Sequence, residues 1–213
     1  MLGRIVLPAL ALAACARGRS DEPIVDGSMT DAKLPDAGAP PIDSPTSSGT
    51  CTMAFAGTLA TWSFVGEAGS QASTAVTTKA TGVTAGAVTR SAGLTATAGT
   101  GSINSSNWAL TAARDLTKYY AFTITPPAGC ELTITGAAVD AKSSGTGPVS
   151  AVISNSTDTY AATATVSTAT AGNVAFAAMA NGMIEVRVYG YAATGTGGTL
   201  RLQNALSITG ELR

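Results

Sequence analysis

The chain has 213 residues, with 12 basic and 13 acidic side chains, a formal net charge of −1 and no histidine. In residues 51–213 the charges are spread singly, so there is no basic patch for nucleic acid and no charged run for a polyelectrolyte partner. Without histidine, Ser-His-Asp and Cys-His catalysis and the usual zinc sites are excluded.

The first fifteen residues have the pattern of an export signal. Arg4 precedes an apolar run from Ile5 to Ala14, which is too short to span a bilayer as a helix. The run ends in Leu12-Ala13-Ala14-Cys15, which resembles the lipobox of bacterial lipoproteins. That resemblance implies cleavage before Cys15 and lipidation of this cysteine, and Ala16 after it implies sorting to the outer membrane. The alternative is an ordinary secretory signal with an incidental cysteine.

Residues 16–50 form a segment of different composition, dominated by Pro, Asp, Ser, Gly and Ala. Such a segment cannot bury a core. We predict a disordered tether that would span roughly 30–35 Å root-mean-square as a flexible chain. The alternative is an arm packed on the domain through Ile24, Val25 and Met29.

Residues 51–213 are long enough for one domain with its own core. With Cys15 assigned to lipid, Cys51 and Cys130 remain. Two cysteines in an exported domain most simply form a disulfide, here worth up to roughly 4.5 kcal/mol in the chain-entropy model. The alternative is a pair of buried free thiols.

Alternating side chains predict an all-β domain. In Tyr119–Thr125 the larger residues Tyr120, Phe122 and Ile124 share one face. We expect this strand to form a hairpin with Cys130–Val139, and Asn181-Gly182 to close a two-residue hairpin turn.

The other expected elements are weaker. Residues 66–81 and 95–107 are rich in small and polar residues and predict loops, and Trp108–Leu116 is a marginal helix candidate. Further strands are expected at 58–65, 83–94, 149–153, 173–179, 184–189 and 200–203. Short strands separated by turn signals predict an antiparallel β-sandwich with a thin core and hydroxyl-rich faces.

Several short motifs of this domain resemble jelly-roll domains of bacterial exported surface proteins. They are Thr61-Trp62-Ser63-Phe64, Tyr119–Thr123, Gly147-Pro148 followed by Ser154–Tyr160, Arg187–Ala192 and Gly198–Asn204. The resemblance implies a jelly-roll-like shape, as in lectins and carbohydrate-binding modules, and fixes no ligand.

Aromatic residues are the candidate ligand-binding residues. Sugar-binding sandwiches stack aromatic rings on pyranose faces, and Trp108, Tyr160, Tyr189 and Tyr191 lie at loops or expected strand ends. The competing interpretation is that isolated rings pack in the fold, as we expect for Trp62, Tyr120 and Phe122.

Carboxylates give weaker indications. Glycoside hydrolysis needs a pair of them across the scissile bond, and the available ones lie in no recognisable motif: Glu67, Asp115, Glu131, Asp140, Asp158 and Glu185. No loop has the spacing of a calcium site. We therefore expect no enzyme, no metal site and no cofactor, although a structural calcium held by Asp115, Asp140 and Asp158 is the alternative.

Together these patterns predict a non-catalytic lipoprotein anchored in the cell envelope, at the outer membrane, through its lipid. Its domain is expected to bind polysaccharide or another envelope component and no nucleic acid. The alternative is a passive structural or assembly subunit of the envelope, with a glycoside hydrolase less favoured.

Overall fold

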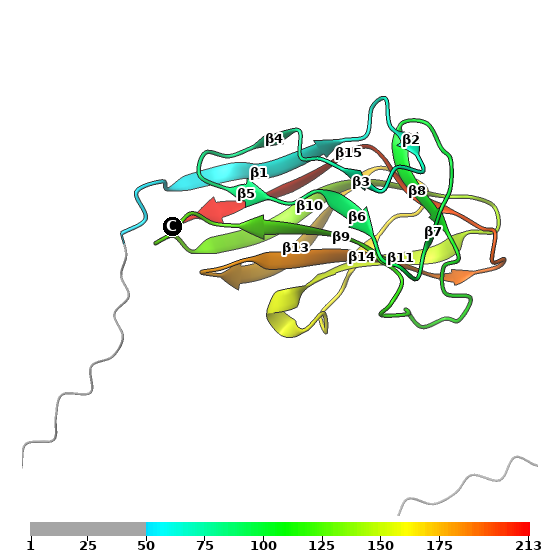
Figure 1. The fold of residues 1–213 in the computed structure, drawn as a ribbon. Coiled ribbons are helices and arrows are strands. Elements are labelled where there is room, and N and C mark those ends of the chain that lie inside the picture. The colour runs from blue at the N-terminus through cyan, green and yellow to red at the C-terminus, as the bar shows by residue number, and fades with distance from the viewer. Residues whose placement is uncertain (1–49) are drawn as a thin grey trace, which may run out of the picture. The chain divides into compact units, whose positions relative to one another are not determined.

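The computed structural model describes residues 50–213 as one β-rich domain (Figure 1). The predicted signal peptide with Cys15 and nearly all of the predicted tether, residues 16–49, lie outside the described residues. Among residues 50–213 no helix is long and apolar enough to cross a membrane.

Two sheets make up the domain, and their strands are mostly antiparallel. The first sheet consists of β1 (Phe55–Ser63), β2 (Ala68–Gly69), β4 (Thr78–Lys79), β7 (Thr95–Ala96), β8 (Ser102–Ser106), β10 (Leu132–Ser143), β13 (Gly172–Ala180) and β15 (Leu200–Leu212). The second consists of β3 (Ser73–Thr74), β5 (Thr84–Ala85), β6 (Val88–Arg90), β9 (Tyr119–Thr125), β11 (Pro148–Asn155), β12 (Ala164–Val166) and β14 (Ile184–Ala193). One short 3₁₀ helix, η1 (Ser156–Asp158), follows β11.

The strand order is that of a jelly roll. The neighbours β1-β15-β10-β13 form the main path of the first sheet, and β9-β14-β11-β12 form that of the second. Taken in chain order, these eight strands change sheet at every connection except that between β11 and β12, and the first and last lie side by side, as in two nested Greek keys. The jelly-roll-like sandwich predicted from the sequence is therefore confirmed.

Period-two alternation places the core between the sheets. Tyr120, Phe122 and Ile124 of β9 face inward and are at most 2% exposed, as predicted. The indole of Trp62 meets the Phe122 ring with centroids 4.6 Å apart and donates from Nε1 to the carbonyl of Gly86 at 2.9 Å. The paired ring and satisfied N–H make Trp62 a central core residue, again as predicted.

The expected hairpins are wrong. β9 and β10 belong to different sheets, so the Pro126-Pro127 connection crosses the sandwich. Likewise β13 pairs with β10, whereas β14 pairs with β11 and β9, so Asn181-Gly182 joins two sheets. Alternation reports which face of a strand is buried but does not report its partner.

The predicted loop at 95–107 contains β7 and β8. β8 pairs with β15, and its Ser102, Asn104 and Ser105 are buried. These polar side chains bond to the chain that covers them, as when Asn104 Nδ2 donates to the carbonyl of Ala98 at 2.8 Å, although Asn104 Oδ1 has no partner within residues 50–213. The helix candidate at Trp108–Leu116 is also wrong, because this segment contains no helical residue.

The predicted disulfide is confirmed. Cys51 and Cys130 are bonded, with their Cα atoms 4.5 Å apart. The bond joins the chain just before β1 to the chain just before β10, two strands that both pair with β15.

Candidate functional site

The outer face of the second sheet carries an unusual group of side chains. Along β14, Ile184, Val186 and Val188 point into the core, so Glu185, Arg187 and Tyr189 project outward. Neighbouring chain adds three more residues, and the group is called here the tyrosine–arginine cluster. Its members are Arg114, Tyr119, Tyr160, Glu185, Arg187 and Tyr189.

Arg187 is the centre of the cluster. Its guanidinium carbon lies 4.0 Å from the ring centroids of both Tyr119 and Tyr160. Glu185 accepts hydrogen bonds from Arg187 Nε and, at 2.9 Å, from the hydroxyl of Tyr160. Two cation–π contacts and an ion pair hold one arginine rigidly, which is the kind of arrangement that fixes side-chain geometry at a surface.

Tyr160 reaches the cluster because of its backbone. Asn155 caps η1, and Thr159 and Tyr160 then adopt φ of 57° and 62°, in the left-handed region. Non-glycine residues rarely adopt this conformation, and it concentrates at functional sites. Partial burial and the adjacent Glu185 raise the pKa of Tyr160 to about 12, so its hydroxyl stays a donor at neutral pH.

Tyr189 and Arg114 form the second part of the cluster. Tyr189 is 0% exposed although it lies on the outer face, because Arg114 covers its ring with the guanidinium carbon 5.2 Å from the centroid. Arg114 Nη2 donates to the carbonyl of Tyr160. Among residues 50–213, neither Arg114 Nη1 nor Tyr189 Oη has a hydrogen-bond partner, and both atoms are buried.

Ser154 adds a further unpaired group to this face. It lies opposite Arg187 in the β11–β14 ladder, is 1% exposed, and its Oγ has no partner within the described chain. An unpaired buried polar group costs about 1–3 kcal/mol. Three such groups on one sheet face therefore indicate a region that is not optimised for stability alone.

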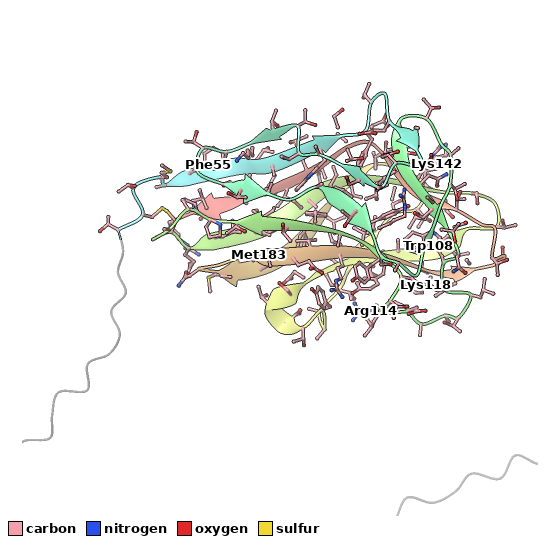
Figure 2. The ribbon with its side chains drawn as sticks, viewed as in Figure 1. Phe55, Trp108, Arg114, Lys118, Lys142 and Met183 are labelled. Carbon is pink, nitrogen blue, oxygen red and sulfur yellow. A yellow bond between two sulfur atoms is a disulfide. The ribbon has the colours of Figure 1, made fainter. Side chains whose placement is uncertain are left out.

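A hollow of about 340 Å³ opens beside the cluster. Arg114, Val152, Thr163 and Tyr191 line it, together with the small side chains of three alanines. Val152 pairs across the strands with Tyr189, so the floor of the hollow adjoins the buried tyrosine. Figure 2 shows Arg114 on the lower side of the domain in this view, near the middle of its length.

The structure brings three of the four predicted ligand-binding residues together. Tyr160 and Tyr189 belong to the cluster, and Tyr191 lines the hollow. Trp108 is different and corrects the prediction: its indole is 1% exposed, packs on Tyr120 at 5.3 Å between centroids, and donates to the carbonyl of Ser105 at 2.7 Å. A ring buried in this way offers no face for stacking, and the same holds for Tyr189, which is 0% exposed beneath Arg114.

The named carboxylates are dispersed over the domain. Asp140 accepts hydrogen bonds from Gln203 and Asn204, Asp158 accepts from the backbone N–H groups that follow η1, and Glu131 pairs with Arg213. Hydrogen bonds from Thr117 lower the pKa of Asp115. Within residues 50–213 no group of three or more His, Cys, Asp or Glu side chains could hold a metal ion.

Sequence reasoning missed Tyr119, Arg187 and Arg114. The outward positions of β14 carried a usable signal, because Glu185, Arg187, Tyr189 and Tyr191 alternate with inward aliphatic or small residues. No sequence pattern indicates Arg114, which lies in an irregular segment before β9.

Fold and site together define a jelly-roll sandwich with an aromatic and cationic patch on one outer face. Comparisons of the chain with known protein families, curated proteins and solved structures found no match.

Proposed function

We propose that this chain is a non-catalytic cell-surface lipoprotein whose sandwich binds polysaccharide. The observation that carries the proposal is the pairing of the tyrosine–arginine cluster with the adjoining hollow. Aromatic rings supply apolar contact area to sugar C–H faces, while arginine, tyrosine and threonine supply hydrogen bonds to sugar oxygens. A hollow lined by apolar side chains together with a few polar groups is the usual form of a ligand site.

The absence of catalysis is part of the same proposal. Glu185 is the carboxylate of the cluster, and it is occupied by Arg187 and Tyr160. A hydrolase needs a second carboxylate facing it across the bond that is cleaved. Asp158 on η1 is occupied by the N–H groups of Ala161 and Ala162, and Asp140 and Glu131 lie on β10 or just before it in the other sheet.

Anchoring rests on the leader, with its apolar run and Leu12-Ala13-Ala14-Cys15. Several acyl chains on one residue give stable membrane attachment, because each buried methylene adds roughly 0.8 kcal/mol. Cells fed labelled palmitate should incorporate it into the chain, and Cys15→Ser should abolish the label. Equal label in both would refute anchoring at this residue.

A glycan array probed with the purified full chain, with and without calcium, tests binding. We expect specific retention of a polysaccharide class, and Tyr191→Ala should weaken it at least about fivefold, since a stacked ring contributes roughly 1 kcal/mol or more. Val65→Ala is a matched control, because Val65 is 78% exposed and lies outside the cluster and the hollow. Silence on the array in both conditions would contradict the proposal.

One observation favours the assembly alternative. β13 lies at the edge of the first sheet, and its nine residues, GNVAFAAMA, contain no charge and no proline. Such an edge can accept a strand from a neighbouring molecule. Concentration-dependent association in sedimentation, abolished by Ala175→Lys and unchanged by polysaccharide, would support a structural subunit in place of a binding module.

A further inference from the structure

Arg114 is a cation without an anion. Within the described domain the two ion pairs are Arg187 with Glu185 and Arg213 with Glu131, so Arg114 is not neutralised by either. Its position is nevertheless fixed, because Nη2 donates to the carbonyl of Tyr160 and the guanidinium lies over the Tyr189 ring. Arg114 therefore lines the hollow as a positioned cation with no ion-pair partner within residues 50–213, and it is available to bind an anionic ligand.

The unpaired atoms around Arg114 specify the chemistry of that partner. An arginine side chain has donors only, so whatever completes Arg114 Nη1 must provide acceptor oxygens. Tyr189, which is fully buried under Arg114, also has an unpaired hydroxyl within residues 50–213. Of these two residues Arg114 lines the hollow, whereas Tyr189 lies buried behind it, so a ligand in the hollow is expected to place oxygen acceptors at Arg114.

The remaining lining specifies what carries those oxygens. Val152 and three alanines give the hollow small apolar walls, while Tyr191 and Thr163 add a ring face and hydroxyls. The apolar side chains can contact the C–H faces of a sugar ring, and the one cation, Arg114, can pair with one negatively charged group on that ring. A planar carboxylate also matches the planar fork of a guanidinium.

We infer that the hollow beside Arg114 binds a sugar residue bearing a carboxylate, that is, a uronic acid unit of an acidic polysaccharide. This inference rests on the proposed function and names its substrate class. Arg114 pairs with the carboxylate, and Tyr191 and the small walls contact the ring. One arginine is enough to pair with the single carboxylate of one sugar unit. Binding of this kind needs no run of basic residues, in agreement with the way the basic residues of the domain are spread singly along the chain.

The test uses the full chain with polygalacturonate and with the same polymer after methyl esterification, which keeps the backbone and removes the charge. Titration calorimetry should give tighter binding of polygalacturonate by at least about tenfold, the loss expected when a charge-assisted hydrogen bond is removed. Dextran sulfate and neutral dextran serve as further arms. This comparison needs no variant, so it is independent of any folding defect.

Two substitutions locate the charge. Arg114→Gln should lower polygalacturonate affinity at least about tenfold and Arg114→Lys by less, since lysine keeps the charge and loses the fork. Arg201→Gln is the matched control: it removes the same charge from β15 in the other sheet and should change affinity less than about twofold. Thermal unfolding of each variant verifies folding.

The outcomes separate the inference from the proposal on which it rests. Equal binding of the charged and esterified polymers, unaffected by Arg114→Gln, would overturn the carboxylate inference and leave polysaccharide binding intact. Stronger binding of dextran sulfate than of polygalacturonate would also overturn it. If no polysaccharide binds in any arm, the proposed function fails as well.

Discussion

The two outer faces of this sandwich differ in how far their polar side chains are paired with one another. On the first sheet they pair with one another: Thr61 Oγ1 and Ser207 Oγ are 3.1 Å apart, and Asn204 Nδ2 donates to Asp140 at 2.6 Å. On the second sheet Ser154 Oγ and Tyr189 Oη are buried and have no partner in the described domain. The first sheet has one such atom as well, Asn104 Oδ1 of β8, so the two faces differ in degree.

This difference shows which part of the domain has a lower free energy of unfolding than full pairing of its polar groups would allow. Small hydroxyl side chains on a sheet can satisfy each other across strands at little cost. The second sheet instead carries large rings and two arginines, and it also has left-handed backbone at Thr159 and Tyr160. Left-handed backbone and unpaired groups beside the tyrosine–arginine cluster are typical of a region selected for binding, although Asn204 of β15 in the first sheet also has a φ of 55°.

Replacing Trp108 by alanine should have the largest effect on stability, because this side chain belongs to the core between the two sheets. Loss of the buried indole and of its bond to Ser105 should lower the free energy of unfolding by about 3–5 kcal/mol. Urea unfolding measures the change. Leu110→Ala, at a side chain 52% exposed, should stay within about 0.5 kcal/mol. A loss below 1 kcal/mol for Trp108→Ala would show that the indole is not a core residue.

Removing the Tyr189 hydroxyl should have a smaller effect of opposite sign. Tyr189→Phe keeps the ring under Arg114 and deletes an unpaired buried group, so the free energy of unfolding should rise by about 1 kcal/mol. On the first sheet Thr61→Val deletes one partner of a hydrogen bond and should lower it by about 1 kcal/mol. Urea unfolding of both variants compares the faces directly. If both variants lose stability equally, the contrast between the faces is wrong.

The smallest effect concerns alkaline pH. Burial and Glu185 raise the pKa of Tyr160 to about 12, above the value of about 10 for an unfolded tyrosine, so the folded chain holds this proton more tightly. Stability from Tyr160 is therefore fully present below about pH 10 and is lost as the pH rises toward 12. Tyr160→Phe should reduce the slope of unfolding free energy against pH in that range. An unchanged slope would show that Tyr160 titrates alike in both states.

The positions of the strands could be predicted from the sequence better than the way the strands pair. Tyr119–Thr125 was predicted with its buried face because large and small residues alternate there, and β9 has these bounds. The pairing of β9 with β14 was not predictable, since it joins residues far apart in the chain. β8 was missed for a different reason: Ser102, Asn104 and Ser105 are buried polar residues, and polar composition normally indicates a loop.

The candidate site was predictable in the same partial way. Tyr160, Tyr189 and Tyr191 stood out because aromatic residues are scarce, and all three lie at the cluster or the hollow. The same argument misplaced Trp108, because sequence position after a loop does not report burial. Arg114 depends on tertiary packing against Tyr189, which no local pattern encodes.

The disulfide would have a mechanical consequence if the chain is anchored through its N-terminal residues, as proposed above. If tension enters through the residues before Cys51, the covalent bond passes it directly to Cys130 and β10. β1, which would otherwise peel from β15 first, then carries none of the load, and residues 52–129 are bypassed on the way to β14 and its arginine. Disulfide formation would thus take the first strand of the domain out of the path of the force.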